Sequence, residues 1–264
     1  MEKINFKKKY GQNFLSDTNL LKAIVADSSL MQSDEVLEIG AGAGALTKII
    51  AKNCQKLISY EIDEELKPVL ENNLSEFNNI KLIFSDIMKI NIKDIEKDFS
   101  GKYKIIANLP YYITTPIIFK FLEETDRVES LTIMVQKEVA EKILAKPKSS
   151  SYGILSVMCN YFTTPKISRI VKKQMFTPMP KVDSAIVVMK RKTVPYSEGF
   201  KKFVQSAFSM RRKTLVNNLL SLYPKNVIED VLINSGYKLS VRAEELSEGE
   251  FENLFKIFDK KSIK

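Results

Sequence analysis

Five short apolar runs rich in valine and isoleucine occupy the first half of the chain, and stretches with helical spacing separate them. The runs are EVLEIG (35–40), KLISYEI (56–62), KLIFSDI (81–87), KIIANL (104–109) and SLTIMVQ (130–136). Apolar runs of this length are typical of strands buried on both faces, and their alternation with helices predicts a mostly parallel sheet with helices on both sides. Two later runs, KISRIVKKQMF (166–176) and SAIVVMKRK (184–192), predict an antiparallel pair that closes one edge.

The pattern changes after Lys192, where the strand-like runs end. TVPYSEG (193–199) has the composition of a linker, and the stretches 200–223 and 250–260 have helical spacing. We therefore predict two domains. Residues 1–192 form an α/β domain with a basic N-terminal arm, and residues 193–264 form a small, all-helical domain.

The composition excludes several classes of chemistry. The chain has no histidine and only two cysteines, Cys54 and Cys159. Catalysis by an imidazole base, histidine-ligated zinc and a disulfide framework are therefore excluded, and we expect no metal site. No apolar run approaches the ~20 residues of a membrane helix, and the basic N-terminus lacks the apolar segment of a signal peptide. We expect a cytoplasmic protein without a membrane segment.

The formal charge of +9 is concentrated at the two ends of the chain. Residues 1–13 carry four basic and one acidic side chain, residues 14–189 carry 22 of each, and residues 190–264 carry 15 basic and nine acidic ones. This distribution indicates contact with a polyanion; the alternative is a basic surface that only maintains solubility. The residues predicted to make this contact are Lys7, Lys8, Lys9, Arg211, Arg212 and Lys213. Because the last three are consecutive, they are expected to fan around a helix.

A glycine-rich stretch, VLEIGAGAGALT (36–47), joins the first predicted strand to a predicted helix. Missing side chains at such a turn let a ligand approach the backbone and the helix N-terminus. Gly40, Gly42 and Ala45 fit the fingerprint of dinucleotide-binding sites, and Glu61 lies roughly 20 residues downstream, where an acidic residue holds ribose hydroxyl groups. Both NAD and S-adenosylmethionine fit this stretch.

Acidic residues near this turn favour S-adenosylmethionine over NAD. Glu38 would repel a pyrophosphate but suits a ligand that carries an ammonium and a sulfonium group. Asp86, at the end of the third run, can accept a hydrogen bond from an adenine amino group, and Ile62 and Ile87 can hold the ring between them. Taken alone, each acidic residue could simply be a solvated side chain at the end of a strand. Together, however, they recur at the carboxyl ends of the strands, where open α/β sheets bind ligands.

The stretch NLPYY (108–112), which ends the fourth run, suits a site for an amino group on a flat ring. The alternative is a strand that simply ends in a turn at Pro110. The exocyclic amine of a purine is a poor nucleophile, so a site that methylates it must accept hydrogen bonds from its N–H groups and hold it in line with the methyl group. The Asn108 side-chain carbonyl and the Leu109 backbone carbonyl are suitable acceptors, and Tyr111 offers a face for stacking. No histidine base is needed.

Seven motifs occur in one order along the chain: KKKYGQNFLSD, VLEIGAGAGALT, YEID, NLPYYITTPI, MVQKEVAEKI, FTPMPKVDSAIV and MRRKTLVNNL. In these motifs, and over nearly its whole length, the chain resembles the KsgA family of ribosomal RNA adenine dimethyltransferases. The resemblance implies a Rossmann-like class I methyltransferase fold, S-adenosylmethionine as cofactor, and dimethylation of adenine N6 amino groups in 16S ribosomal RNA. The implied partner is the immature 30S ribosomal subunit, with the protein otherwise monomeric.

Together with the residues argued above, the resemblance assigns a site. The predicted cofactor-binding residues are Gln12, Asn13, Leu15, Gly40, Gly42, Glu61, Ile62, Asp86, Ile87 and Asn108. The first three would close over the cofactor, the glycines would meet its methionine portion, and the acidic residues would bind its ribose and adenine. The predicted catalytic residues are Asn108, Leu109, Pro110, Tyr111 and Phe176, with the two rings on opposite sides of a flipped base. Tyr112 departs from the family, in which asparagine is common, and is expected to reshape the rim of the base pocket.

Three alternatives are weighed against this interpretation. The Erm resistance enzymes methylate an adenine of large-subunit RNA on the same fold; they more often have isoleucine in the second position of NLPY and asparagine in place of Asp183. A nucleic-acid-binding assembly or transcription factor without activity is disfavoured by the intact NLPYY and GAGAG motifs. An NAD-dependent enzyme is disfavoured by Glu38 and by the lack of an evident hydride-transfer acid.

Overall fold

The structure is a computed structural model that describes residues 14–15 and 17–262. Its contacts divide the chain into two compact units, Met1–Ala140 with Pro165–Arg191, and Glu141–Thr164 with Lys192–Lys264. The boundary predicted at residue 192 assigned residues 141–164 to the first domain. In the structure they group with the second unit, because α7 (Ile154–Phe162) packs against α8 (Glu198–Ala207) and α11 (Glu248–Ser262).

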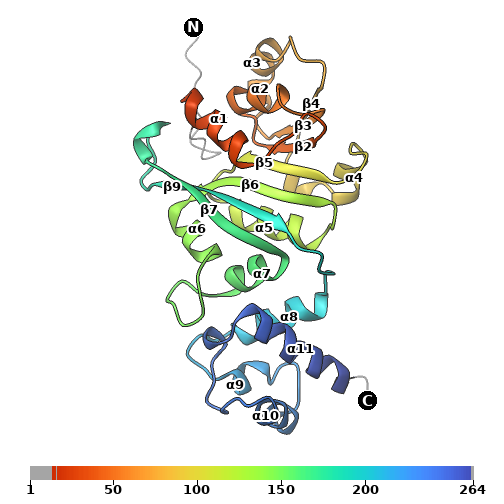
Figure 1. The fold of residues 1–264 in the computed structure, drawn as a ribbon, viewed down its shortest axis with the longest axis vertical. Coiled ribbons are helices and arrows are strands. Elements are labelled where there is room, and N and C mark those ends of the chain that lie inside the picture. Colours follow the sequence, from red (N-terminus) through yellow and green to blue (C-terminus); the bar gives the residue numbers. More distant parts are fainter. Residues whose placement is uncertain (1–13, 16, 263–264) are drawn as a thin grey trace. The chain divides into compact units, whose positions relative to one another are not determined.

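A seven-stranded sheet forms the centre of the first unit (Figure 1). The strand order is β4-β3-β2-β5-β6-β9-β7. The neighbours among the five strands from β4 to β6 in this order are parallel, and β9 is antiparallel to β6. The bounds are β2 (Glu35–Ile39), β3 (Lys56–Glu61), β4 (Ile80–Phe84), β5 (Tyr103–Asn108), β6 (Val128–Gln136), β7 (Thr163–Val171) and β9 (Ser184–Arg191). A separate antiparallel pair joins β1 (Phe14–Leu15) to β8 (Phe176–Thr177). The predicted fold class is confirmed.

Helices lie on both faces of this sheet. The bounds are α1 (Thr18–Asp27), α2 (Ala45–Ala51), α3 (Lys67–Asn73), α4 (Ile92–Glu96), α5 (Thr114–Glu123) and α6 (Lys137–Ile143). α1 and α2 contact each other and cover one face, whereas α5 lies on the opposite face beside β6 (Figure 1). Asp17 fixes the start of α1, because its carboxylate accepts hydrogen bonds from two backbone N–H groups of the first turn at 2.8 and 3.0 Å.

The core explains why the strand runs are apolar throughout. Successive strand residues point to opposite faces of a sheet, and Val36 and Leu37 of β2 are both fully buried. Val36 belongs to an apolar cluster that α1 and α2 share with Leu57 and Ile106 of the neighbouring strands. Because both faces are covered, both must be apolar, which is the pattern that the five runs show.

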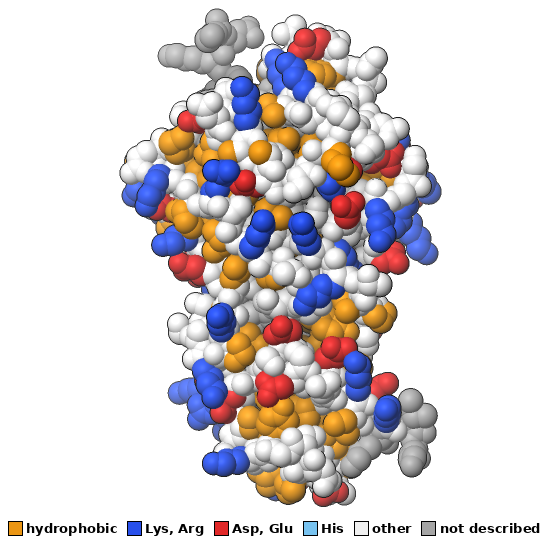
Figure 2. Space-filling view, viewed as in Figure 1, with side chains coloured by type: hydrophobic (Ala, Val, Ile, Leu, Met, Phe, Trp, Pro, Cys, Tyr) orange, Lys and Arg blue, Asp and Glu red, His pale blue; other side chains and the backbone are white. Residues whose placement is uncertain are grey.

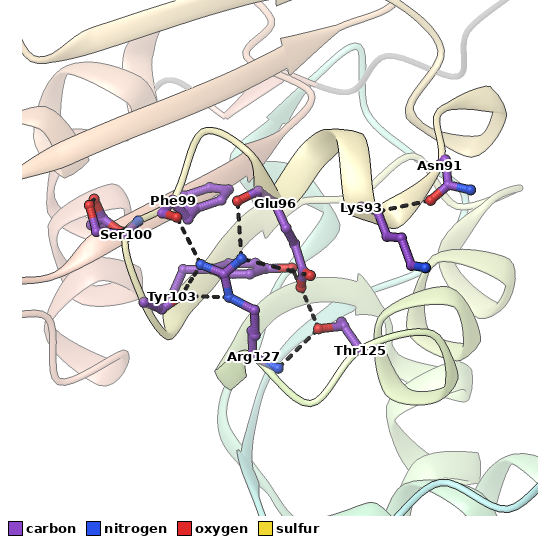
Figure 3. A network of polar contacts seen from close by, with 10 residues as sticks. Asn91, Lys93, Glu96, Phe99, Ser100, Tyr103, Thr125 and Arg127 are labelled. Atoms are coloured by element: carbon purple, nitrogen blue, oxygen red, sulfur yellow. Dashed lines mark hydrogen bonds and ion pairs between the residues drawn. The ribbon is translucent and has the colours of Figure 1, made fainter.

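A polar network ties α4 to the amino ends of β5 and β6 (Figure 3). Arg127 donates four hydrogen bonds of 2.8–3.1 Å to backbone carbonyl groups between Glu96 and Gly101. The hydroxyl groups of Thr125 and Tyr103 both donate to the Glu96 carboxylate. The network therefore anchors the amino ends of these strands, opposite the carboxyl ends where the predicted site residues lie.

The second unit contains α7, α8, α9 (Leu215–Leu219), α10 (Lys225–Asn234) and α11. Its core is aromatic: Phe203 is fully buried, and its ring centroid lies 6.3 and 5.5 Å from those of Phe251 and Phe258. In the described part of the chain, no helix combines the length and the apolar character needed to cross a membrane.

The helical prediction for residues 200–223 was wrong in its middle, because the chain turns between α8 and α9. The Asn218 side-chain amide donates to two backbone carbonyl groups at and after the end of α8, at 2.6 and 3.2 Å, and the Thr214 hydroxyl accepts a hydrogen bond at the start of α9. These bonds end one helix and begin the next. Arg211, Arg212 and Lys213 therefore lie in a turn and not around a helix.

Candidate active site

Four predicted site segments meet at one edge of the sheet. β2, β3, β4 and β5 are neighbours and run parallel, so their carboxyl ends lie side by side. Gly40 follows β2, Glu61 ends β3, Asp86 follows β4 and Asn108 ends β5. The strand order reverses between β2 and β5, and open α/β sheets bind ligands at such a switch point. The fold thus brings together residues that are widely spaced in the sequence.

The glycine loop passes beside the end of β5. Gly40, Gly42 and Gly44 have φ angles of 83°, 56° and 84°, a left-handed conformation that residues with a side chain rarely adopt. A Cβ atom on Gly40 would lie 3.7 Å from the backbone oxygen of Asn108, and the Gly40 N–H donates to Tyr60 O at 2.8 Å. The Gly40 N–H thus connects the loop to β3, and the Gly40 backbone passes close to the end of β5.

Glu61 holds the glycine loop in place. Its Oε2 accepts a hydrogen bond from Gly42 N at 2.8 Å, and its Oε1 accepts bonds from Ile62 N and Asp63 N, both at 2.9 Å. Burial raises the pKa of the Glu61 carboxyl group, although these backbone N–H groups act to lower it. The carboxylate predicted to bind a ribose thus already orders the loop.

Glu38 is fully buried at the end of β2. Its Oε2 accepts a hydrogen bond from the Ser59 hydroxyl at 2.6 Å, while its Oε1 has no hydrogen-bond partner among the described residues. Burial raises the pKa of Glu38 to about 7; the hydrogen bond from the Ser59 hydroxyl group acts to lower it, and the Glu61 carboxylate raises it further. An unpartnered carboxyl oxygen close to the glycine loop suits a cationic ligand group.

The residues predicted to contact adenine occupy neighbouring strand ends. Asp86 Oδ1 accepts a hydrogen bond from Met88 N at 3.0 Å, and Asp86 Oδ2 lies 4.0 Å from Lys89 Nζ. Ile87 is buried and Ile62 is half-buried. β3 and β4 pair from Leu57 to Glu61. Ile62 and Asp86 therefore follow the carboxyl ends of two neighbouring strands.

The NLPY segment is held on both sides. Asn108 pairs with Met134 of β6, and Leu109 N donates to Met134 O at 3.3 Å. The Pro110 carbonyl accepts a hydrogen bond from the Thr114 hydroxyl at 3.2 Å, at the start of α5. Leu109 is buried, whereas Asn108 and Pro110 are half-buried. Strand pairing and the following helix therefore fix the backbone of this segment, including the Leu109 carbonyl group.

Ser184 was missed by sequence reasoning. It is the first residue of β9, is fully buried, and pairs with Gln136 at the end of β6. Its Oγ lies 2.8 Å from the Tyr111 hydroxyl, so the two groups share a hydrogen bond. Burial raises the pKa of Tyr111, and this hydrogen bond lowers it. The sequence offered one signal for Ser184: it is a small hydroxyl residue at the start of a predicted antiparallel strand, which begins where the parallel strands end.

Phe176 lies in the core and not on an open surface. Its side chain is 4% exposed and belongs to the apolar cluster that contains Leu21 and Ile186. Through the pairing of β8 with β1, its backbone lies opposite Leu15. Stacking of a base on Phe176 would require a movement that exposes the ring, and its role at the base stays a prediction.

Several predicted residues lie outside the described part of the chain: Lys7, Lys8, Lys9, Gln12 and Asn13. Leu15 is described only as a backbone partner in β1. Among the described residues, no group of three or more potential ligands that could hold a metal ion occurs.

The three basic residues between α8 and α9 differ in their surroundings. Arg211 Nε donates to Glu244 at 3.1 Å, and Arg211 Nη2 donates to Ser150 O at 2.7 Å. Arg212 and Lys213 are exposed and form no ion pair with the described residues. Arg211 is therefore engaged within the second unit, while its two neighbours face solvent.

A parallel sheet with its glycine loop at the switch point, next to an NLPY strand end, is the architecture of a Rossmann-like methyltransferase. The model of the ribosomal RNA adenine dimethylase family matches residues 3–260. The chain belongs to this family and is an rRNA methyltransferase.

Similar proteins agree with this membership. The chain is 43% identical over 264 residues to ribosomal RNA small subunit methyltransferase A of Ligilactobacillus salivarius, covering 95% of this chain and 89% of the relative. It is 40% identical over 262 residues to the protein of the same name from Streptococcus thermophilus, covering 94% and 90%.

Two solved structures are similar along nearly the whole chain. A dimethyladenosine transferase from Plasmodium falciparum has a TM-score of 0.82 at 27% identity, covering 94% of this chain and 98% of that one. The 23S rRNA methyltransferase ErmE has a TM-score of 0.71 at 28% identity, covering 94% and 100%. A dimethyladenosine transferase and a 23S rRNA methyltransferase thus share this fold.

Proposed function

We propose that this protein uses S-adenosylmethionine to dimethylate N6 amino groups of adenines in the 16S RNA of the small ribosomal subunit. Relatives at 40–43% identity that are named small-subunit methyltransferases support this substrate. Similarity to ErmE does not separate small-subunit from large-subunit RNA, because one fold serves both. The proposed partner is the immature 30S particle, and the proposed location is the cytoplasm.

The residues at the strand ends fit S-adenosylmethionine. When bound, this cofactor supplies an electrophilic methyl group on a sulfonium centre. Glu38 offers a buried carboxyl oxygen without a partner among the described residues, which suits the positive charges of such a ligand. Glu61 would hold the ribose with the same carboxylate that orders the glycine loop, and Asp86 would accept a hydrogen bond from the adenine amino group.

Asn108 and Leu109 would hold the target amine. The Asn108 side-chain oxygen and the Leu109 carbonyl would accept its two N–H groups, which favours a lone pair localised on nitrogen, the atom that attacks. Because strand pairing already fixes the backbone of this segment, the Leu109 carbonyl group needs little reorganisation. Tyr111, bonded to Ser184, would support the base after it leaves its stack.

One observation supports the proposal most directly: the glycine loop passes close to the strand end that carries NLPY. A Cβ atom on Gly40 would lie 3.7 Å from the backbone oxygen of Asn108, so a cofactor bound at the loop would lie beside the proposed amine acceptors. The transfer needs no imidazole base, and the chain has no histidine.

Methyl incorporation into purified ribosomal subunits tests the proposed function. The protein is incubated with labelled S-adenosylmethionine and with small or large subunits that lack the modification, and the adenines are analysed by mass spectrometry. We expect dimethyladenosine in the small subunit only. Incorporation into the large subunit alone, or into neither subunit, would refute the proposal.

Replacing Asn108 tests the active-site assignment. Asn108→Ala removes an acceptor for the reacting amine, and loss of one such preorganised group reduces turnover roughly 10²- to 10³-fold, or about 3 kcal/mol. Asn72→Ala, on an exposed stretch of α3, is the matched control and should leave the rate unchanged. Near-normal dimethylation by the Asn108 variant would contradict the assignment.

A further inference from the structure

A groove of about 800 Å³ lies between α1, α2 and α3, on the outer side of the helices that cover one face of the sheet. Its floor includes Ala26, Leu30 and Ile49, whose side chains are partly exposed, and its end includes Ala43 of the glycine loop and Ala45 at the start of α2. The groove therefore begins beside the glycine loop and extends along the α1–α2 face. None of the residues assigned above to cofactor or base lines it.

Three lysines line this groove, and no acidic residue of the described chain lines it with them. Lys22 comes from α1, Lys48 from α2, and Lys52 from the end of α2. None of the three forms an ion pair with the described residues, although Lys52 Nζ lies 5.9 Å from the centroid of the Phe77 ring. In Figure 2, lysine and arginine side chains are visible among hydrophobic ones over the region that Figure 1 labels α1 to α3.

The lining combines positive charge with an apolar floor, and this combination selects the ligand. An anionic group alone would use the lysines but not Ala26, Leu30 and Ile49, whereas an apolar ligand would leave the lysines unpaired. A strand of RNA has both parts, because its phosphates carry the charge and its bases and riboses present flat or apolar surfaces. The chain's own N-terminal arm is disfavoured as the occupant, since residues 1–13 carry four basic side chains and one acidic one.

We propose that this groove binds one strand of the substrate RNA, outside the nucleotide that is methylated. Lys22, Lys48 and Lys52 contact its phosphates, and the apolar floor supports a base or ribose. The proposal rests on the proposed function for the identity of the RNA. It adds a contact surface on α1 and α2 that differs from the basic ends of the chain and that positions the RNA relative to the glycine loop.

Salt-dependent binding tests the groove. Affinities of the wild type, a Lys22/Lys48/Lys52→Gln variant and a Lys93/Lys97/Lys102→Gln variant are measured for protein-free 16S RNA and for 30S subunits across a salt series. The control variant removes the same charge from exposed lysines near the amino ends of the strands. Each lost phosphate contact reduces the magnitude of the log–log slope by roughly 0.7 to 0.9, so the groove variant should lose about 2 to 3.

Further readouts separate the possible outcomes. Binding of S-adenosylhomocysteine should be the same in all three proteins, because none of the six lysines is assigned to the cofactor. A photo-crosslinker attached at Lys48→Cys should label a discrete stretch of the RNA. Equal slopes for the groove and control variants, or a loss of affinity seen with 30S subunits but not with free RNA, would overturn the proposal; the latter would indicate a ribosomal protein as the partner. These measurements use binding alone, so they stand apart from the methyl-transfer test of the proposed function.

Discussion

Glu38 is a carboxyl group that the fold buries completely, and its protonation links stability to pH. Its pKa in the folded protein is raised to about 7 by burial, above the ordinary value of 4.5. The folded state therefore holds the proton more tightly than the unfolded state does. Stability from this group is fully present below about pH 4.5 and is lost as pH rises through 7.

This linkage gives a pH-dependent prediction for Glu38→Gln. Between pH 5 and pH 8 the wild type should lose about 2 to 3 kcal/mol of unfolding free energy relative to the variant, which cannot titrate at this position. Urea unfolding of both proteins without cofactor at several pH values measures the difference. Both proteins keep Glu61, so its own titration largely cancels. Parallel stability curves would show that Glu38 is ionised normally in the folded protein.

The hydrogen bond between Tyr111 and Ser184 makes Ser184 a positioning residue for the ring that is proposed to support the base. Ser184→Ala and Tyr111→Phe each remove this bond, and each should lower kcat/KM for RNA by roughly 5- to 10-fold, in line with about 1 kcal/mol for one hydrogen bond. The double variant should be no worse than either single variant, because the same bond is lost. S-adenosylhomocysteine affinity should stay unchanged in all three. Additive losses would mean that the two residues act independently.

At the scale of elements, the Arg127 network connects α4 to the amino ends of β5 and β6. Arg127→Ala breaks four hydrogen bonds to backbone carbonyl groups and should lower the unfolding free energy by about 2 to 4 kcal/mol, with cofactor affinity unchanged at the opposite edge. Lys97→Ala is the control, because it removes an ion pair with Asp94 in which both side chains are exposed, and it should change stability little. Similar losses in both variants would show that the backbone carbonyl bonds add no stability beyond an exposed pair.

At the scale of the whole molecule, the basic C-terminal segment divides into structural and solvent-facing charges. Arg211→Gln breaks bonds to Glu244 and to the Ser150 carbonyl, so it should destabilise the second unit and leave the salt dependence of RNA binding nearly unchanged. An Arg212/Lys213→Gln variant should keep its stability and lower the log–log slope by about 1 to 2. Thermal unfolding and binding to 30S subunits across a salt series distinguish the two. Unchanged slopes in both variants would remove this segment from the RNA contact.

The sequence by itself determined the strands of the parallel sheet, the glycine loop and the strand end that carries Asn108. Each depends on neighbouring residues: continuous apolar runs indicate strands covered on both faces, and closely spaced glycines after one of them indicate a turn that a ligand can approach. The convergence of Gly40, Glu61, Asp86 and Asn108 also followed, because the carboxyl ends of parallel strands meet at one edge.

Only the tertiary structure decided which distant side chains meet. Ser184 bonds Tyr111 across 73 residues of chain, Phe176 is buried in the core, residues 141–164 group with the C-terminal helices, and the Asn218 side chain ends α8. Each of these outcomes depends on contacts whose free energies are set by two or more segments packed together. No local pattern of spacing or composition contains that information, because the partners are adjacent in space and not in sequence.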